Sequence, residues 1–397
     1  ERTELFFSSL ILSLFRPREM SLYVCNVCVL TEWFVAHFYL IIYLEPIVQC
    51  WLLFFSLARS RSIGQCHLIR IMSLRNDICL STFESLPNEL LIEFFEYLSP
   101  LDLYEIFYNL NSRFRSLILS LQNLHLILHE DWDDRINKHS IPPYASQIST
   151  LIIRHDDSLD LSSFINLRAL KLSMPTAEQC NSIHSTCVSN LEHLFISNLF
   201  FAYHSEKLCR WIFSSKFSHL RTCRIDRITF NSYSNYCSLS LRHLTISPCT
   251  WKKNLYEQIF SSCPNLTYLS IIRLRNVSFK LLPNQTFKHT SLRHLNMQFF
   301  SIGNDWYRHI RWLLSIVTNL EHFRLNINQN ENDFEFPFEA FARLLNEHVE
   351  YLKDFQLKIP LNHFQMTDFE FITRLHPLFS HGHINQDEKN SLIISSR

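Results

Sequence analysis

An internal repeat restricts the fold of this sequence more than any other feature. The pattern Leu-x-x-Leu-x-Leu occurs nine times between residues 145 and 360, and successive copies begin 19 to 32 residues apart. The copies begin at Ile148, Leu167, Leu191, Leu220, Leu241, Leu266, Leu292, Leu320 and Leu352. The segments between copies, such as Trp251–Ser262, Trp306–Val317 and Phe338–Val349, have the apolar spacing of helices. The sequence therefore predicts repeating strand–helix units.

One such unit cannot bury its own apolar side, so the units are expected to stack, with parallel strands inside and helices outside. Over roughly residues 145–360 the pattern resembles the leucine-rich repeat, which implies an α/β solenoid. That family places Asn or Cys eight residues after the first Leu. Cys249 and Asn328 fit this position, whereas Pro175, Leu199 and Phe300 do not. We therefore expect the ladder of side-chain hydrogen bonds to be partly absent.

Residues 82–128, ahead of the repeat, have the pattern of three short helices. Pro87 suits the first turn of a helix, because its missing N–H has no partner there in any case. Apolar residues then follow with helical spacing up to Leu98, and Ser99-Pro100 ends that helix. A unit of this size is marginally stable alone, and its apolar surface exceeds what three helices bury among themselves. This excess predicts a docking surface.

The order Leu-Pro-x-Glu-Leu-Leu, Phe-x-Tyr-Leu-x-Pro-x-Asp-Leu and Arg-Phe-Arg in this segment is similar to the F-box. The resemblance implies binding to the Skp-type adaptor of cullin-RING (SCF) ubiquitin ligases, with the repeat selecting the protein to be ubiquitylated. Many family members carry a valine-cysteine pair and a tryptophan in the third helix, where this chain has Leu110-Asn-Ser-Arg113-Phe114. The residues that the resemblance places against the adaptor are Leu86, Pro87, Leu90, Leu91, Phe95, Leu98, Leu101 and Leu103.

The concave face of the solenoid is the predicted surface for a protein substrate. Alternate residues of a strand face opposite sides, so the third, fifth and seventh residues of each copy are expected on this face. They form a polar surface with aromatic and arginine anchors, which is typical of protein-binding patches. The candidate substrate contacts are His193, Phe195, Arg224, His243, Tyr268, His294, His322 and Arg324. His294 and His322 lie in adjacent copies, so a metal site or pH sensor is an alternative to plain repeat consensus.

The sequence contains no pattern that predicts catalysis, a cofactor or a metal site. Its three glycines, Gly64, Gly303 and Gly382, are too far apart for a phosphate-binding loop. The 37 basic and 37 acidic residues cancel, so no nucleic-acid partner is expected. We predict a chain that is not an enzyme and that brings a substrate close to ligase partners. The alternatives are a repeat scaffold without ligase function and a membrane-anchored repeat receptor.

Residues 1–80 are hydrophobic and contain cysteines, and we predict that they form no folded domain, with Met72 as a candidate translation start. Trp33–Leu57 is long enough for a membrane span, but Glu45-Pro46 interrupts it. Cys25 and Cys28 form a CxxC pair without a second pair, which is too few ligands for zinc. The 12 scattered cysteines suggest reduced thiols and a cytoplasmic or nuclear location, with a membrane as the alternative. Residues 361–397 are predicted to be a C-terminal cap and polar tail.

Overall fold

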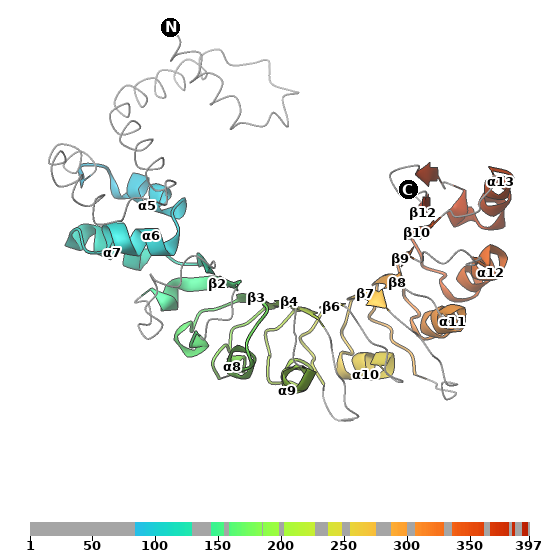
Figure 1. Ribbon diagram of the computed structural model, residues 1–397, viewed down its shortest axis with the longest axis horizontal. Coiled ribbons are helices and arrows are strands. Elements are labelled where there is room, and N and C mark those ends of the chain that lie inside the picture. Colours follow the sequence, from blue (N-terminus) through green and yellow to red (C-terminus); the bar gives the residue numbers. More distant parts are fainter. Residues whose placement is uncertain are drawn as a thin grey trace, which may run out of the picture. The chain divides into compact units, whose positions relative to one another are not determined.

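The computed structural model in Figure 1 is divided by its contacts into two compact units, Glu1–Leu91 and Ile92–Arg397. The structure describes residues 84–128, 144–154, 159–184, 186–197, 202–226, 237–247, 255–274, 287–299, 306–328, 336–360, 366–380, 383–385 and 391–395. The candidate membrane span Trp33–Leu57 and the pair Cys25 and Cys28 lie outside these residues. Within them, no helix combines the length and the apolar character needed to cross a membrane.

Three short helices precede the sheet: α5 (Asn88–Glu96), α6 (Pro100–Phe107) and α7 (Ser112–Ser120). Local capping explains where the last two begin. The Ser99 hydroxyl accepts a hydrogen bond from the Asp102 amide at 3.2 Å, and the Asn111 side chain accepts one from the Phe114 amide at 2.9 Å. Each cap satisfies an amide that has no partner within the first turn of its helix, so these side chains set the helix boundaries.

An aromatic cluster holds the second half of α5 against α6 and α7. The ring of Phe95 lies 5.2 Å from that of Phe107 and 6.2 Å from that of Phe114, measured between centroids. Edge-on and tilted contacts at such distances are favourable beyond the area that they bury. Phe95 is fully buried, so it belongs to the core of this helical segment.

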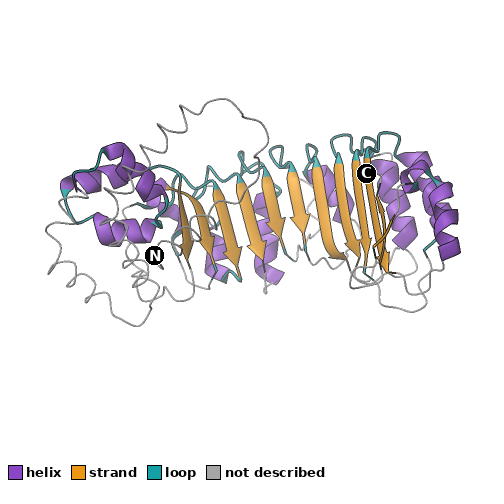
Figure 2. Cartoon of the chain, turned by 90° about the horizontal axis from the view of Figure 1, so that it is seen from above, coloured by secondary structure: helices purple, strands orange, loops and turns teal. Residues whose placement is uncertain are grey.

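A single twelve-stranded sheet forms the body of the second unit (Figure 2), in the order β1-β2-β3-β4-β5-β6-β7-β8-β9-β10-β12-β11. Strands β1 to β10 are parallel neighbours in chain order, and β12 pairs antiparallel with both β10 and β11. The strands are β1 (Leu124–Leu128), β2 (Ile148–Ile153), β3 (Ala169–Ser173), β4 (His193–Ser197), β5 (Thr222–Ile225), β6 (His243–Ile246), β7 (Tyr268–Leu274), β8 (His294–Phe299), β9 (His322–Ile327), β10 (Asp354–Pro360), β11 (His383–Asn385) and β12 (Ser391–Ser395).

Helices lie between several pairs of successive strands and cover one face of this sheet (Figure 1). They are α8 (Ala177–Ser182), α9 (Ala202–Ile212), α10 (Leu255–Ser262), α11 (Trp306–Ile316), α12 (Phe338–His348) and α13 (Met366–Leu375). Helices α10, α11 and α12 lie within the segments that the apolar spacing predicted. The mostly parallel α/β arrangement with helices on the outside is therefore confirmed. We call the opposite face of the sheet the open face.

The repeat pattern builds the core, because its apolar positions all point to the helix-covered side. In the copy that contains β8, for example, Leu292, Leu295 and Met297 occupy the first, fourth and sixth positions, and all three are buried. Burying a side chain of this size contributes roughly 1.5–3 kcal/mol. The same three positions repeat in register from strand to strand, so neighbouring copies share one continuous apolar core.

A ladder of polar side chains joins neighbouring copies, one residue before the first Leu of a copy. The amides of Asn166, Asn190, Asn265 and Asn319 each donate to a backbone carbonyl of the preceding copy, at 2.7 to 3.0 Å. The family pattern places such a ladder eight residues after the first Leu, where we expected it to be partly absent. Asn328 fits that position, but it is exposed, and among the described residues its hydrogen bond runs from its backbone amide to the Phe299 carbonyl and not from its side chain. Cys249, the other predicted member, lies outside the described residues.

This ladder makes a direct prediction for stability. Replacing Asn265 with alanine removes the hydrogen bond to the Leu239 carbonyl and is expected to lower the free energy of unfolding by about 1 kcal/mol. Asn328→Ala is the matched control and should change it by less than about 0.5 kcal/mol. Urea unfolding followed by circular dichroism measures both. Equal losses in the two variants would contradict the ladder seen here.

The C-terminal segment differs from the expected polar tail. Residues Ser391–Ser395 form β12, whose Leu392 and Ile394 are buried, and β12 pairs along β10 from Gln356 to Pro360. The prediction of a tail was therefore wrong for these residues. Antiparallel pairing gives β10 a partner on its outer side, so the backbone groups of this last parallel strand are not left as an open edge.

Candidate functional site

The residues predicted to contact an adaptor differ in their exposure. Leu91, Phe95 and Leu103 are fully buried, Leu86, Leu98 and Leu101 are partly buried, and Pro87 and Leu90 are exposed. The three buried side chains fill space inside the protein, so they support the fold and offer no area to a partner. Leu90, whose side chain is 43% exposed, is the largest accessible apolar residue of the predicted set. Such a leucine on a short helix is available for docking.

The third residues of successive copies form a continuous row on the open face, because the strands are paired in register. We call this the third-position row, and its members from β4 to β10 are His193, Thr222, His243, Tyr268, His294, His322 and Asp354. Four of the predicted substrate contacts are histidines of this row, and Tyr268 lies between two of them. The alternation of the strands thus brings together the residues that the sequence analysis singled out.

Ring contacts run along the row from β6 to β9. The ring centroids of His243 and Tyr268 are 5.9 Å apart, those of Tyr268 and His294 are 6.1 Å apart, and those of His294 and His322 are 4.2 Å apart. The last two rings are nearly parallel, with an interplanar angle of 7°. Stacked rings that lose little conformational freedom on binding form a rigid contact surface.

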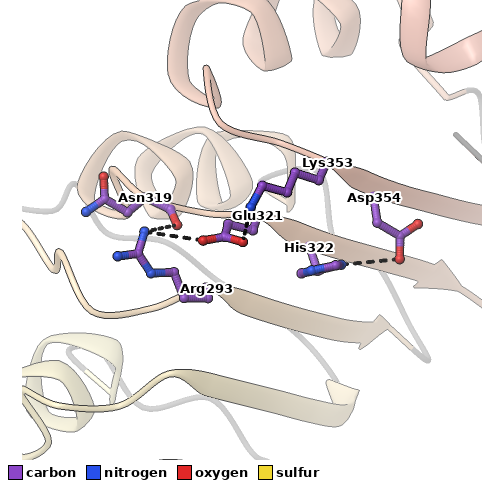
Figure 3. A network of polar contacts seen from close by, with 6 residues as sticks. All are labelled: Arg293, Asn319, Glu321, His322, Lys353 and Asp354. Atoms are coloured by element: carbon purple, nitrogen blue, oxygen red, sulfur yellow. Dashed lines mark hydrogen bonds and ion pairs between the residues drawn. The ribbon is translucent and has the colours of Figure 1, made fainter.

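Asp354 ends the third-position row and orients two neighbouring side chains. Its Oδ2 atom lies 3.4 Å from Nδ1 of His322 and 4.0 Å from the guanidinium of Arg324. Asp354 is buried, whereas Arg324 is mostly exposed. Figure 3 shows the carboxylate of Asp354 directed towards the imidazole of His322. The carboxylate therefore offsets positive charge at this end of the open face.

Two histidines in the middle of the third-position row, His243 and His294, have pKa values below the ordinary one. Burial and, to a smaller extent, His193 lower the pKa of His243 below its ordinary value. Burial, followed by the neighbouring His322, lowers the pKa of His294. Neutral imidazoles both donate and accept hydrogen bonds, so this part of the face is suited to the mixed polar and aromatic contacts of a protein partner.

A second network lies just before the strands, at the second residue of each copy (Figure 3). The ammonium of Lys353 donates to Glu321 at 2.7 Å, and Arg293 lies 3.6 Å from the same carboxylate. The hydrogen bond from Lys353 is the main cause that lowers the pKa of Glu321. Exposed ion pairs of this kind contribute little to stability. They do fix the side chains that border the open face.

The fifth residues of the copies form a parallel row beside the histidines. Phe195, Arg224 and Arg324, all predicted substrate contacts, belong to it, and Lys171 precedes Phe195 in the same row. Arg224 and Arg324 are exposed, and Phe195 is partly buried. All eight predicted substrate contacts thus lie on the open face. The list left out Asp354 and Lys171, although both stand at third or fifth positions of a copy and the same rule identifies them.

The described cysteines do not form a reactive centre or a metal site. No disulfide bond joins any of the described cysteines, which are Cys180, Cys187, Cys209, Cys223, Cys237 and Cys263. The sulfur of Cys187 lies 3.1 Å from Nε2 of His184, but burial and the nearby Asp160 raise the pKa of this thiol, whereas nucleophilic chemistry needs the thiolate. Among the residues that the structure describes, no group of three or more His, Cys, Asp or Glu side chains could hold a metal ion.

The chain was also compared with known proteins. No protein-family model matches this chain, and no curated protein matches it.

Proposed function

We propose that this protein is a non-enzymatic substrate receptor of an SCF-type ubiquitin ligase. The observation that supports this proposal is the order of its parts. An F-box-like motif coincides with three short helices, α5 to α7, of which α6 and α7 have side-chain caps. A leucine-rich-repeat-like sheet follows, and its open face carries polar and aromatic residues and is covered by none of the described helices. A receptor of this kind needs one surface for the adaptor and a separate surface for the substrate.

The proposed division of work requires no chemistry from this chain. The helical segment would bind the Skp-type adaptor, and the open face would hold the protein to be modified. Holding the substrate near the charged ubiquitin carrier raises the effective concentration of its lysines, which accelerates transfer without a catalytic group in the receptor. The aromatic and arginine side chains of the open face have the chemistry of binding hot spots.

Co-purification tests the adaptor half of the proposal. The tagged full chain is expected to recover the adaptor and a cullin, and Leu90→Asp should reduce this recovery at least about tenfold, since it places a charge on a predicted apolar contact. Leu239→Asp is the matched control, because Leu239 is also exposed, at 60%, but lies in the repeat. Failure of the unmodified chain to recover either protein would refute the ligase proposal.

The substrate half makes a separate prediction. Replacing Tyr268, His294 and Arg324 together with alanine should remove the captured substrate while leaving adaptor recovery unchanged, because these residues lie on the open face and not in the helical segment. Quantitative mass spectrometry of proteins stabilised by proteasome inhibition measures the loss. A set of captured proteins identical to that of the unmodified chain would contradict a role for this part of the face.

The burial of Leu91, Phe95 and Leu103 favours a second candidate function. These three predicted adaptor contacts are fully buried, which leaves less apolar area for an adaptor. A repeat protein that binds its partner without recruiting a ligase would have the same open face. The co-purification experiment separates the two functions, because a scaffold retains its protein partner in the absence of adaptor and cullin.

A further inference from the structure

The open face of the first five strands has a chemical character of its own. Its fifth-position row contains Ile127, Ile152, Lys171, Phe195 and Arg224, one from each of β1 to β5, and the pairing register places each beside the next. We call these five residues the basic stripe. Since neighbouring strands lie about 4.8 Å apart, the stripe is about 19 Å long.

Within the part of the chain that the structure describes, the two cations of the basic stripe form no ion pair, unlike Arg324 in the same row. Lys171 and Arg224 are exposed, and neither forms an ion pair with any residue that the structure describes. Asp226, two residues after Arg224, is partly buried and already has a partner. Arg324, at the same position in a later copy, lies 4.0 Å from the buried Asp354. The whole chain has zero formal net charge, so this local surplus is a property of the stripe.

Apolar side chains separate these cations. Ile127 is 36% exposed, which is unusual for an isoleucine in a sheet, and Ile152 and Phe195 are partly buried. A surface that alternates positive and apolar side chains fits a ligand that alternates negative and apolar ones. Lys171 and Arg224 stand two strands apart, which is about 10 Å. Side chains on one side of an extended peptide lie about 7 Å apart for residues two positions apart and about 13 Å apart for residues four positions apart, and the long Lys and Arg side chains can bridge the difference.

We propose that the basic stripe binds an extended acidic segment of a protein partner, in which acidic and apolar residues alternate along one side of the extended chain. This inference rests on the proposed function, because it assigns a chemical class to the segment by which the open face recognises its substrate. Carboxylates would pair with Lys171 and Arg224, and apolar side chains would cover Ile127, Ile152 and Phe195.

The same observations favour a peptide over a nucleic acid. A nucleic acid presents closely spaced phosphates and needs a broad basic surface, whereas the stripe offers two cations separated by an aromatic ring. Stacking platforms for bases are aromatic, and two of the three apolar members of the stripe are isoleucines. An acidic segment with apolar side chains uses every residue of the stripe.

A binding experiment with defined peptides tests this inference on the full chain, without adaptor. The probe is a fluorescein-labelled ten-residue peptide in which Glu and Leu take turns at every second position, with Ser between them, and its reference is the same peptide with Gln in place of Glu. Fluorescence anisotropy should show binding of the Glu peptide that is at least about tenfold tighter than that of the Gln peptide and that weakens as salt increases.

Two variants localise the binding. Arg224→Ala should weaken the affinity for the Glu peptide about tenfold, whereas Arg343→Ala should change it less than about twofold. Arg343 is an equally charged, exposed residue on α12, paired with Glu339 at 3.7 Å, so its variant removes the same charge from another place. Circular dichroism confirms that both variants are folded.

Three outcomes would overturn the inference: equal binding of the Glu and Gln peptides, equal effects of the two variants, or displacement of the peptide by an oligouridylate of the same charge at lower concentration. None of them depends on the ligase. Recovery of adaptor and cullin together with failed peptide binding would therefore reject the acidic segment alone, and the reverse result would reject the ligase alone.

Discussion

Replacing Phe323 with alanine is expected to lower the free energy of unfolding of the repeat region by about 3–5 kcal/mol. Phe323 occupies the fourth position of its copy in β9 and is completely buried. Its ring lies 6.0 Å from that of Phe355 in β10 and 6.5 Å from that of Phe341 in α12. The substitution therefore leaves a cavity at the point where two strands and an outer helix meet, and surrounding aromatic rings cannot collapse into it without losing their own contacts.

A matched phenylalanine gives the control. Phe371 in α13 is 52% exposed, so Phe371→Ala removes the same atoms from a site that water already reaches and should cost less than about 1 kcal/mol. Urea unfolding followed by circular dichroism and tryptophan fluorescence measures the free energy of unfolding of both variants. The fluorescence probes include Trp306 and Trp312 in α11, the helix that precedes β9 in the chain. Similar losses for the two variants would mean that β9 and α12 do not pack as the structure has them.

Much of the sheet could be predicted from local sequence alone. Each Leu-x-x-Leu-x-Leu copy places its apolar residues on one side of a single strand, and the spacing of copies leaves room for one helix between strands. Because parallel stacking follows once each unit must bury the same side, the order from β2 to β10 needs no long-range information.

The remaining strands depend on contacts that no local pattern encodes. The segment of β1 has only five residues and lacks the repeat, yet Leu126 and Leu128 are buried and β1 pairs along β2. The segment of β12 is also short and stands in polar surroundings, and it becomes a strand because β10 offers it an unpaired edge. Short apolar runs of this kind cannot be assigned from periodicity alone.

In the candidate site, too, some features could be predicted from local sequence and others depend on contacts between distant residues. Alternation along a strand was enough to assign His294 and Arg324 to the open face, because it is a property of each strand by itself. The contact of Asp354 with His322 and Arg324 depends on the register between β9 and β10, which becomes known only with the folded sheet. The asparagine ladder could have been predicted from the Asn that stands directly before the first Leu of several copies. The leucine-rich-repeat pattern instead places the ladder residue eight positions after that Leu.

Acidification from pH 7.5 to 5.5 is expected to lower the free energy of unfolding of the repeat region, because several histidines are buried in the neutral form. His309 and His289 are buried, and burial is the main cause that lowers the pKa of each, in the case of His309 far below its ordinary value. In the unfolded chain both titrate near pH 6.5. Between the folded and the unfolded pKa the unfolded chain binds more protons, so stability falls as the pH falls.

The size of this effect follows from proton linkage. Each histidine that stays neutral in the folded chain lowers the free energy of unfolding by about 1.4 kcal/mol for every pH unit below 6.5. Carboxylates do not obscure this range: Glu321 and Asp160 have lowered pKa values, so the stability that they contribute is lost only at more acidic pH. Urea midpoints measured across the range should therefore fall steadily from pH 7 to 5.5.

His309→Gln isolates the largest of these contributions. The side chain of His309 shares a 2.8 Å hydrogen bond with the hydroxyl of Tyr256, and glutamine can keep that bond without binding a proton. The variant should be less stable than the parent at pH 7.5 and should lose less stability on acidification. Plotted against pH, the free energies of unfolding of the variant and the parent should therefore converge towards pH 5.5. His219→Gln, at an exposed position, should keep the full pH dependence. Parallel curves for His309→Gln and the parent would mean that the histidine is not held neutral, and hence that the contact between α10 and α11 is more open to water than the packing around Tyr256 indicates.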